Sequence, residues 1–471
     1  MNAHTELRHA RPDARSVADV VSRLCADFGE RASTARAARD AHSHGEGMAD
    51  AALPDVVVFP QTTEEVAAIV RLAHAARVPV IPFGVGTSLE GHVAALYGGV
   101  SIDLSRMNRI IEVNAEDLDC RVEAGLTREA LNAGLKGSGL FFPIDPGADA
   151  TIGGMASTRA SGTNAVRYGT MRENVLGLTV VTADGRIIHT GGRARKSSAG
   201  YDLTRLFVGA EGTLGVITEV QLRLYGVPEA ISAAVCQFAD LEGAVNTVIS
   251  AMQQGIPVAR IELLDAMQMR ACINYSKLEG FIEAPTLFFE FHGSAAGVAE
   301  QAEAMQAITA EFVGSAFEWA TRPEDRTRLW KARHAAYYAS MALAPGKQGF
   351  ATDACVPISR LADCILETRA DIDATGLVAS IVGHVGDGNF HVVVLFDPDD
   401  PAEREKAEGF TQRTSLRAIA MGGTCTGEHG VGVHKLAALV AEHGEAVDVM
   451  RAIKRALDPH DIMNPGKTVP M

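Results

Sequence analysis

The residues most able to do chemistry lie in the segment Gly383–His391, which reads Gly-His-Val-Gly-Asp-Gly-Asn-Phe-His. Apolar runs flank its Asp-Gly pair, a pattern typical of a tight β-hairpin. If Asp387 and Gly388 form a two-residue turn, His384 lies directly opposite His391, with Cβ atoms about 4.5–5.5 Å apart. Two imidazoles held this close can bind one divalent metal ion. The alternative is that both histidines only pack at the end of a buried hairpin.

A second cluster follows further along the chain. The glycine-rich segment Thr426–Gly430 contains Glu428 and His429, a carboxylate and a third imidazole. Two histidines and one glutamate suit Zn, Mn or Fe and leave coordination positions open for a substrate. We therefore expect His384, His391 and Glu428 to be metal ligands. Cys425 lies nearby, but no base adjoins it in sequence, so it is interpreted as a small packed residue and not as a nucleophile.

Bulk composition limits the class of protein. A chain of 471 residues is too long for one core and predicts two or three domains. No apolar run reaches the ~18 residues of a membrane-spanning helix, and the polar N-terminus does not resemble a secretion signal. A net charge of −15 argues against nucleic acid and anionic membrane partners. The seven cysteines are scattered and include no Cys-x-x-Cys pair, which indicates reduced thiols in a reducing compartment. We expect a cytoplasmic protein, with peripheral attachment to the inner membrane as the alternative.

The pattern of elements predicts an α+β chain. A helix is expected over residues 16–28, and a capping box of Thr62 and Glu65 predicts a second helix that runs to about residue 76. Later helices are expected over residues 295–312, 323–342, 401–421 and 435–457. Antiparallel pairing at the histidine hairpin implies a sheet covered by helices in the second half. The expected parts are an N-terminal helical segment and linker (1–53), a first domain (54–227), a second domain (228–457) and a C-terminal segment (458–471).

Glycine-rich loops dominate the first domain. One loop, from Pro82 to Gly91, follows a predicted strand, and Gly, Ser and Thr recur between short strands over residues 143–224. Dense glycine lets backbone amides approach an anionic ligand closely. Leu89 stands where a G-x-G-x-x-G loop would need its third glycine, and the loop lacks a P-loop lysine. A Rossmann or P-loop nucleotide site is therefore disfavoured.

Taken in order, these motifs resemble one flavoprotein family. The segments Gly84–Ser88, Asp145–Gly154 and Gly209–Gly215 are similar to the FAD-binding domain of the vanillyl-alcohol oxidase (PCMH-type) family. The histidine hairpin, the Glu428-His429 pair and the segment Asn464–Lys467 resemble one branch of it, the FAD-linked 2-hydroxy-acid dehydrogenases. The resemblance covers nearly the whole chain. It implies a PCMH-type FAD-binding domain followed by a substrate or cap domain, with the C-terminal segment returning to the FAD site.

The resemblance also implies which residues bind FAD. The cofactor would lie extended, with its pyrophosphate against the backbone amides of Gly84–Ser88. The implied cofactor-binding residues are Pro82, Gly84, Gly86, Thr87, Ser88, Pro146, Gly147, Thr151, Gly153, Gly154, Ser161, Gly162, Tyr168, Gly169, Glu211, Gly212, Gly215, Ile217 and Asn464. Some relatives attach the flavin covalently through a histidine, and His92 directly follows the loop. This branch usually binds FAD non-covalently, so His92 is interpreted as structural.

The reaction implied by the resemblance is oxidation of a small D-2-hydroxy acid. Arg333, on a predicted helix, would bind the substrate carboxylate; the alternative is an arginine on a solvated helix face. A metal held by His384, His391 and Glu428 would make the α-hydroxyl more acidic, and His429 would accept its proton. The hydride would pass to FAD. Electrons would then leave to cytochrome c, an electron-transfer flavoprotein or a quinone.

Three positions favour a monocarboxylic substrate. The hydroxyglutarate branch resembles this chain but has a Lys near Ala351, a Thr at Tyr337 and an Asn at Val393. Without those polar groups a second carboxylate has no partner. D-Lactate is therefore the expected substrate, with glycolate and D-2-hydroxyglutarate as alternatives. From another class, the chain could be a non-catalytic subunit that binds FAD and metal within a larger assembly. A homodimer is the oligomeric state considered.

Overall fold

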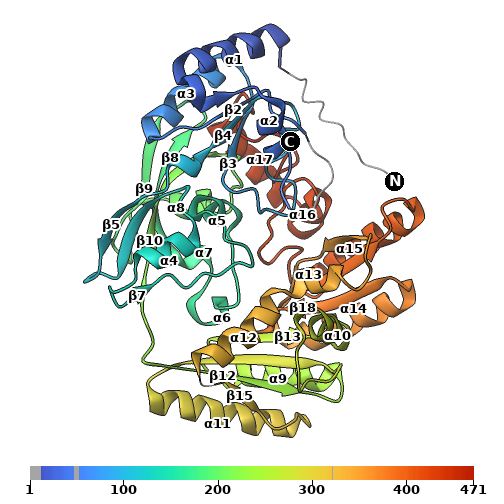
Figure 1. Ribbon diagram of the computed structural model, residues 1–471. Coiled ribbons are helices and arrows are strands. Elements are labelled where there is room, and N and C mark those ends of the chain that lie inside the picture. Colours follow the sequence, from blue (N-terminus) through green and yellow to red (C-terminus); the bar gives the residue numbers. More distant parts are fainter. Residues whose placement is uncertain (1–11, 47–51, 321) are drawn as a thin grey trace. The chain divides into compact units, whose positions relative to one another are not determined.

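The chain divides into two compact units, each formed from more than one stretch of sequence (Figure 1). The computed structural model describes residues 12–46, 52–320 and 322–471, so parts of the predicted N-terminal segment and linker (1–11 and 47–51) lie outside the described residues. Unit 1 takes the described residues of Met1–Ala160, Thr170–Gly226 and Glu428–Met471. Unit 2 takes those of Ser161–Gly169 and Val227–Gly427. Unit 1 thus contains more of the C-terminal region than the segment 458–471 proposed from sequence.

A small sheet in unit 1 presents the glycine-rich loop. Its strand order is β1-β2-β4-β3, with β1 at Ala32–Ser33, β2 at Val56–Val58, β4 at Val100–Asp103 and β3 at Val80–Phe83. Helix α3 (Thr63–Ala76) connects β2 to β3, and both strands pair in parallel with β4. Such a parallel arrangement needs a crossover helix. The loop therefore begins at the carboxyl end of β3.

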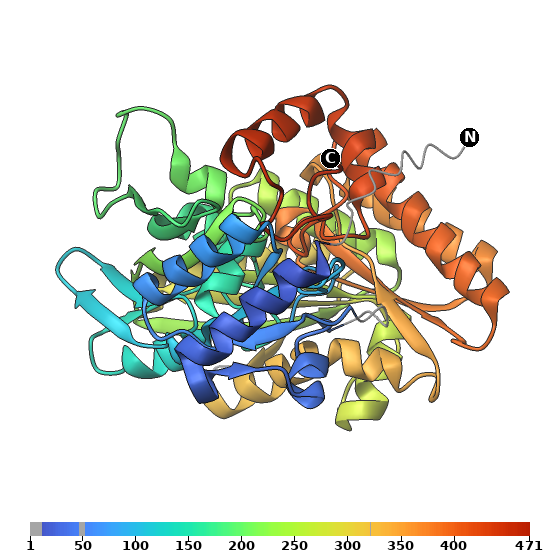
Figure 2. The same cartoon turned by 90° about the horizontal axis from the view of Figure 1, so that it is seen from above.

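Helix α1 (Ala14–Phe28) lies beside α3, as Figures 1 and 2 both show. Asp13 caps α1 by accepting a hydrogen bond from the Ser16 N–H, so the helix starts two residues before the predicted position. Thr62 caps α3 as predicted, accepting from the Glu65 N–H at 3.2 Å. The rest of the capping box is wrong, because the Glu65 carboxylate accepts from the Gln61 N–H and pairs with Arg31.

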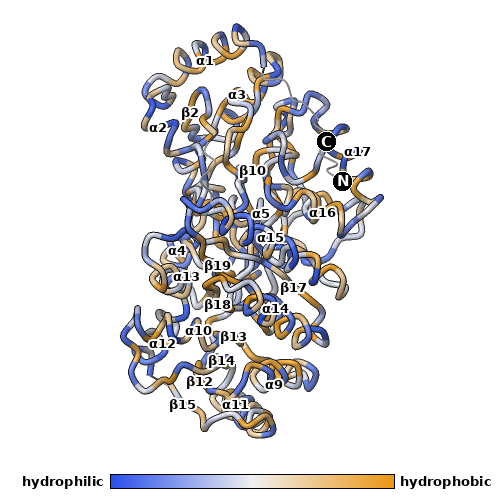
Figure 3. Tube along the Cα trace, turned by 90° about the vertical axis from the view of Figure 1, so that its right-hand side faces the viewer, coloured by the Kyte–Doolittle hydropathy of each residue, from blue (hydrophilic) through white to orange (hydrophobic). Residues whose placement is uncertain are grey.

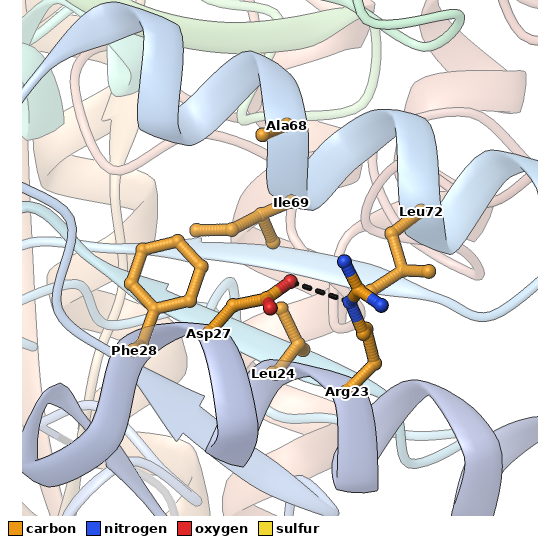
Figure 4. Close-up of a pocket in the computed structure, with 7 residues that line it drawn as sticks. All are labelled: Arg23, Leu24, Asp27, Phe28, Ala68, Ile69 and Leu72. Carbon is orange, nitrogen blue, oxygen red and sulfur yellow. Dashed lines mark hydrogen bonds and ion pairs between the residues drawn. The ribbon is translucent and has the colours of Figure 1, made fainter.

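A pocket of about 330 Å³ lies between α1 and α3 (Figure 4). Leu24 and Phe28 of α1 line it from one side, and Ile69 and Leu72 of α3 from the other. Ala68 of α3 and an ion pair of α1, from Arg23 to Asp27 at 2.7 Å, complete the lining. None of the residues predicted to act in chemistry contributes to this pocket, so it is separate from the candidate site.

The second sheet of unit 1 is antiparallel. Its order is β5-β6-β10-β8-β9, formed by Ile110–Asn114, Asp119–Glu123, Gly215–Arg223, Val175–Thr182 and Ile187–Gly191. Short helix α5 (Ile152–Thr158) packs against β10. The single helix predicted over residues 435–457 is wrong. Gly444 adopts φ +52° and ψ −126°, a backbone conformation that favours glycine, and separates α16 (Leu436–His443) from α17 (Ala446–Leu457).

Unit 2 is built around one antiparallel sheet, as the sequence predicted. The main strand order is β15-β12-β14-β13-β18-β19-β16, and β17 also pairs with β19. In that order the strands are Glu318–Ala320, Ala230–Gln237, Thr286–Gly293, Arg260–Leu264, Val378–Gly383, Asn389–Phe396 and Gln348–Ala351, with β17 at Ala354–Cys355. Every residue of β19 is buried, and Figure 3 shows hydrophobic colour along β18 and β19.

Helices cover both faces of this sheet (Figure 1). On one face lie α9 (Leu241–Gln253), α11 (Ala295–Glu311), α14 (Leu361–Thr375) and α15 (Pro401–Ala420). On the other lie α10 (Ala266–Ser276), α12 (Pro323–His334) and α13 (Ala336–Met341). The predicted helix 323–342 is therefore two helices. No helix in the described part of the chain is long and apolar enough to cross a membrane.

The histidine hairpin differs from the predicted two-residue turn. Strand β18 ends at Gly383 and β19 begins at Asn389, and the residue opposite His391 is Val382, not His384. The connection contains a short 3₁₀ turn (Val385–Asp387) closed by Gly388 at φ +76°. The predicted register is wrong by two residues. A two-residue shift leaves His391 on the expected sheet face, because side chains alternate with a period of two.

Candidate active site

The glycine-rich loop after β3 is closely packed by its own neighbours in unit 1. A Cβ on Gly84 would collide with the Thr151 hydroxyl, and a Cβ on Gly86 would lie 2.9 Å from the Phe83 ring. The Glu46 N–H donates to the Gly86 carbonyl at 3.1 Å. The loop can thus present bare backbone to a ligand only while both positions stay glycine. A backbone cradle of this kind fits the pyrophosphate of FAD.

Glu211 ties together distant segments of unit 1. Its backbone has φ +52°, and its buried carboxylate accepts hydrogen bonds from the N–H groups of Val431 and Gly432 at 2.7 and 2.8 Å. The Thr468 hydroxyl donates to it at 2.7 Å. Burial alone would raise the pKa of Glu211, but His92 and these donors lower it. The glutamate therefore acts as a charged acceptor that fixes the C-terminal segment.

His92 belongs to the same buried cluster. Its Nε2 lies 3.2 Å from a Glu211 carboxylate oxygen, and its carbonyl accepts from the Asn464 amide at 3.0 Å. Lys467 donates to the Ala94 carbonyl at 2.6 Å and to Asn464 Oδ1 at 2.5 Å. These contacts fit the structural interpretation of His92.

The other implied FAD residues divide between the two units. Unit 1 contains Pro82, Thr87, Ser88, Pro146, Gly147, Gly153, Gly154, Gly212, Gly215 and Ile217, and unit 2 contains Ser161, Gly162, Tyr168 and Gly169. Within unit 2, the Tyr168 hydroxyl lies 2.8 Å from His292 Nδ1, and His292 Nε2 lies 2.7 Å from Glu290.

His384 and His391 lie together in unit 2. Their ring centroids are 5.5 Å apart and the rings are nearly perpendicular. The Nδ1 of His384 lies 2.8 Å from Glu262 Oε1, and the Nδ1 of His391 lies 3.0 Å from the Thr352 carbonyl oxygen. Because an oxygen lies within hydrogen-bond distance of each Nδ1, the neutral tautomer with its proton on Nδ1 has its lone pair on Nε2, the form in which an imidazole binds a metal. Two oriented imidazole donors fit a divalent transition metal.

Unit 2 also fixes the chain that leads to Glu428. Thr426 donates from its hydroxyl to Asp353 at 2.7 Å, and a Cβ on Gly427 would lie 2.6 Å from the Asn389 amide. Gly427 is thus pressed against the start of β19, the strand that carries His391. Glu428 is the next residue, with its Cα about 3.8 Å from that of Gly427.

His429 lies in unit 1 beside a buried carboxylate. A Glu90 oxygen is 3.6 Å from His429 Nδ1, and Glu90 also contacts Lys435 at 2.9 Å and His434 at 3.2 Å. Burial raises the pKa of Glu90, but Lys435, His429 and His434 together hold it well below its usual range. The carboxylate faces Nδ1 of His429, so Nε2 is the nitrogen suited to accept a proton.

Arg333 is buried on α12. Only 7% of the residue is exposed, which excludes the solvated-helix alternative. Its Nε and Nη2 lie 2.9 and 2.6 Å from Glu262 Oε2. Burial alone would raise the pKa of Glu262, but His384 and Arg333 lower it. The structure therefore brings Arg333 and His384 together on one carboxylate, and the His391 ring lies beside that of His384.

Sequence reasoning missed the carboxylates of this face. Arg260 and Glu262 alternate with Ile261 and Leu263, a pattern that predicts a half-buried strand with its polar side in water. Both faces of β13 are instead covered by helices. No local signal distinguishes Glu262 or Glu290 from exposed strand glutamates.

Comparisons with known proteins identify both halves of the chain. Residues 54–191 match the family described as FAD binding domain, and residues 227–468 match FAD linked oxidases, C-terminal domain. The structure resembles p-cresol methylhydroxylase with a TM-score of 0.81 at 18% identity, covering 98% of each chain. It also resembles alkyldihydroxyacetonephosphate synthase with a TM-score of 0.76 at 21% identity, covering 95% of this chain and 85% of that one. These likenesses confirm the predicted PCMH-type fold.

Curated relatives are much closer in sequence. A probable mitochondrial D-lactate dehydrogenase from Danio rerio is 52% identical over 93% of this chain and 89% of its own length. The mitochondrial D-lactate dehydrogenase [cytochrome] of Arabidopsis thaliana is 49% identical over 89% of this chain and 74% of its own. The glycolate oxidase subunit GlcD of Bacillus subtilis is 35% identical over 88% and 89%.

These relatives correct one prediction and confirm another. The expected cytoplasmic location is wrong, because the relatives from Danio rerio and Arabidopsis thaliana are named mitochondrial proteins. Reduced thiols and a polar N-terminus did not discriminate between these compartments. The family resemblance is confirmed, and FAD is the cofactor that its two matching domains specify. The chain belongs to the FAD-linked oxidase family, in the group that includes cytochrome-type D-lactate dehydrogenases and GlcD glycolate oxidase subunits.

Proposed function

We propose that this protein oxidises D-lactate to pyruvate with FAD and a divalent metal ion. The observation that carries the proposal is the arrangement on the sheet of unit 2. A buried arginine and a histidine share Glu262, and a second histidine ring lies 5.5 Å from the first. A 2-hydroxy acid has a carboxylate for the arginine and a neighbouring hydroxyl for a metal. The names of the relatives from Danio rerio and Arabidopsis thaliana support D-lactate.

Each residue has a distinct task in this proposal. Arg333 binds and orients the substrate carboxylate through the N–H groups that Glu262 does not use. His384, His391 and Glu428 hold the metal ion. His429 accepts the α-hydroxyl proton at Nε2, and the Glu90 carboxylate, 3.6 Å from Nδ1, favours the charged ring that results. When bound, the metal supplies Lewis acidity at the hydroxyl and FAD supplies acceptance of the Cα hydride.

We propose a protein acceptor for the electrons. The net charge of −15 suits a basic cytochrome of the c type. An electron-transfer flavoprotein and a quinone are the alternatives, and reoxidation rates with each acceptor at low and high salt distinguish them. Only a charged protein partner gives a rate that falls steeply with salt.

Anaerobic reduction of the bound flavin tests the proposed substrate. D-Lactate should bleach the flavin absorbance of the FAD-loaded, metal-loaded enzyme, and L-lactate should not. Glycolate and D-2-hydroxyglutarate complete the panel, and a faster rate with either would replace D-lactate as the substrate. If no 2-hydroxy acid bleaches a fully loaded preparation, the proposed activity is wrong and the non-catalytic alternative holds.

A further inference from the structure

Glu262 lies at the centre of the buried polar cluster of unit 2. It is completely buried on β13, on the face covered by α12. Its Oε1 accepts from His384 Nδ1 at 2.8 Å, and its Oε2 accepts from Arg333 Nε and Nη2 at 2.9 and 2.6 Å. One carboxylate therefore uses both oxygens on two side chains that come from different elements.

Stability alone does not account for these charges. Burying an ion pair costs the solvation free energy of both ions, and replacing the pair by apolar groups of the same shape often leaves a protein as stable or more stable. The same sheet face shows that apolar packing is available, because Leu264 and Phe288 belong to one apolar cluster with Trp330 of α12. A buried carboxylate in such a setting provides fixed geometry more than folding energy.

The geometry supplied to Arg333 is specific. A guanidinium has five N–H donors in one plane. Glu262 accepts from the edge of the guanidinium that carries Nε. This contact fixes the plane of the guanidinium and the direction in which its opposite edge points. A carboxylate approaching the opposite edge meets donors that have no remaining freedom to rotate, so less rotamer entropy is lost on binding.

The geometry supplied to His384 is complementary. With Nδ1 hydrogen-bonded to a carboxylate, the proton of the neutral ring resides on Nδ1 and the lone pair on Nε2. A carboxylate partner also makes the imidazole a stronger donor to a metal. Loss of such a partner typically weakens metal affinity about 10–100-fold.

We propose that Glu262 is a positioning residue that sets Arg333 for the substrate carboxylate and His384 for the metal at the same time. Binding of substrate and binding of metal are thereby coupled through one side chain. The inference rests on the proposed function for the roles of Arg333 and His384. It adds a residue and a coupling that neither the sequence motifs nor the relatives' names assign.

The test uses full-length, FAD-loaded enzyme stripped of metal and titrated with Mn²⁺, with free Mn²⁺ followed by its electron paramagnetic resonance signal. Glu262→Gln should raise the Mn²⁺ Kd about 10–100-fold, because an amide offers one acceptor oxygen for two donors. FAD content should stay unchanged. Glu290→Gln is the matched control. Glu290 is another buried carboxylate of this face, paired with His292 at 2.7 Å and Arg260 at 3.5 Å, and its loss should leave Mn²⁺ affinity unchanged.

Arg333→Lys tests the coupling without removing a charge. Arg333 binds no metal in this scheme. If this variant changes the Mn²⁺ Kd, the effect must therefore be transmitted by Glu262, which contacts both Arg333 and His384. We expect a several-fold rise in Kd in the wild-type background and none in the Glu262→Gln background. If Glu262→Gln does not fold, an unchanged Mn²⁺ Kd in Arg333→Lys alone overturns the inference.

The outcomes separate this inference from the proposed function. A folded Glu262→Gln enzyme that binds Mn²⁺ as the wild type does overturns the positioning role, whatever substrate is oxidised. A wild type that binds no Mn²⁺ also overturns it. If Mn²⁺ affinity depends on Glu262 but D-lactate does not bleach the flavin, the positioning role stands and only the substrate is wrong.

Discussion

Ala351 lies directly opposite Val393 in the antiparallel pair of β16 and β19. Val393 follows His391 by two residues, so the two side chains share the sheet face of that histidine. The positions where a diacid enzyme is expected to carry Lys and Asn are therefore cross-strand neighbours beside the proposed metal. Both are apolar here, which fits a substrate with one carboxylate.

Converting this pair should change substrate preference. The double variant Ala351→Lys/Val393→Asn adds an ammonium and an amide on adjacent strands. Because a hydrogen bond to a charged group contributes about 1.5–3 kcal/mol, we expect kcat/KM for D-2-hydroxyglutarate relative to D-lactate to rise ~10–100-fold. Ala351→Met/Val393→Asn is the control without the added charge. An unchanged ratio would show that the second carboxylate binds elsewhere.

Removing a predicted metal ligand should separate turnover from FAD binding. His391→Ala should slow anaerobic flavin reduction by D-lactate at least ~100-fold, because Lewis acid assistance is worth several kcal/mol. FAD should stay bound, since the glycine-rich loop lies in unit 1. His189→Ala is the control, because His189 is exposed and bonds only to Thr179 among the described contacts. If D-lactate reduces the flavin at the wild-type rate in His391→Ala and after the metal is removed by a chelator, the two hairpin histidines have only a structural role.

The buried helix cap Asp265 should make stability fall as pH rises. Burial raises its pKa from 3.8 to about 6, although the hydrogen bond from the Gln268 N–H and the charge of Arg369 act to lower it. The folded pKa lies above the unfolded one, so this stabilisation is complete below pH ~4 and is lost as pH rises through 6. Asp265→Asn should therefore gain about 3 kcal/mol relative to wild type between pH 4 and 7. Urea unfolding at several pH values measures the difference, and a constant difference contradicts the assignment.

Lys467 should act in the opposite pH direction. Burial lowers its pKa to about 7, although the nearby Glu211 favours the charged form. A lowered folded pKa gives stability that is complete above the unfolded value of 10.5 and is lost as pH falls through 7. Relative to Lys467→Met, the wild type should lose about 2–3 kcal/mol between pH 9 and 6. Parallel stability curves for the two proteins would show that Lys467 keeps its proton throughout.

The sequence predicted which helices and strands exist better than it predicted the turns and helix ends between them. Asp387-Gly388 indicated the hairpin correctly, yet Gly388 closes a longer connection instead of forming half of a two-residue turn. Turn type depends on the twist and length of both strands, which a dipeptide does not encode. The helix breaks at Ala335 and Gly444 were missed for a similar reason, since the apolar period continues across each of them.

The side chains proposed for the site could be named from the sequence, but the carboxylates that contact them could not. Arg333, His384 and His391 could be named from motifs and from resemblance. Glu262 and Glu90 could not, because their role depends on burial and on contacts across 71 and 339 residues respectively, from Glu262 to Arg333 and from Glu90 to His429. Partners so far apart in the chain meet only through tertiary structure, on which single-sequence periodicity carries no information.

The contacts of Glu211 also bear on the order in which the protein is made. Its carboxylate accepts a hydrogen bond from the N–H of Val431, which lies 220 residues further along the chain and is therefore synthesised later. At about 5–20 residues per second, a ribosome needs roughly 10–40 s to deliver that partner. Through this interval unit 1 is incomplete, while the larger stretch of unit 2, residues 227–427, is made. A chain that stops before residue 431 therefore leaves the Glu211 carboxylate without the two backbone donors of Val431 and Gly432.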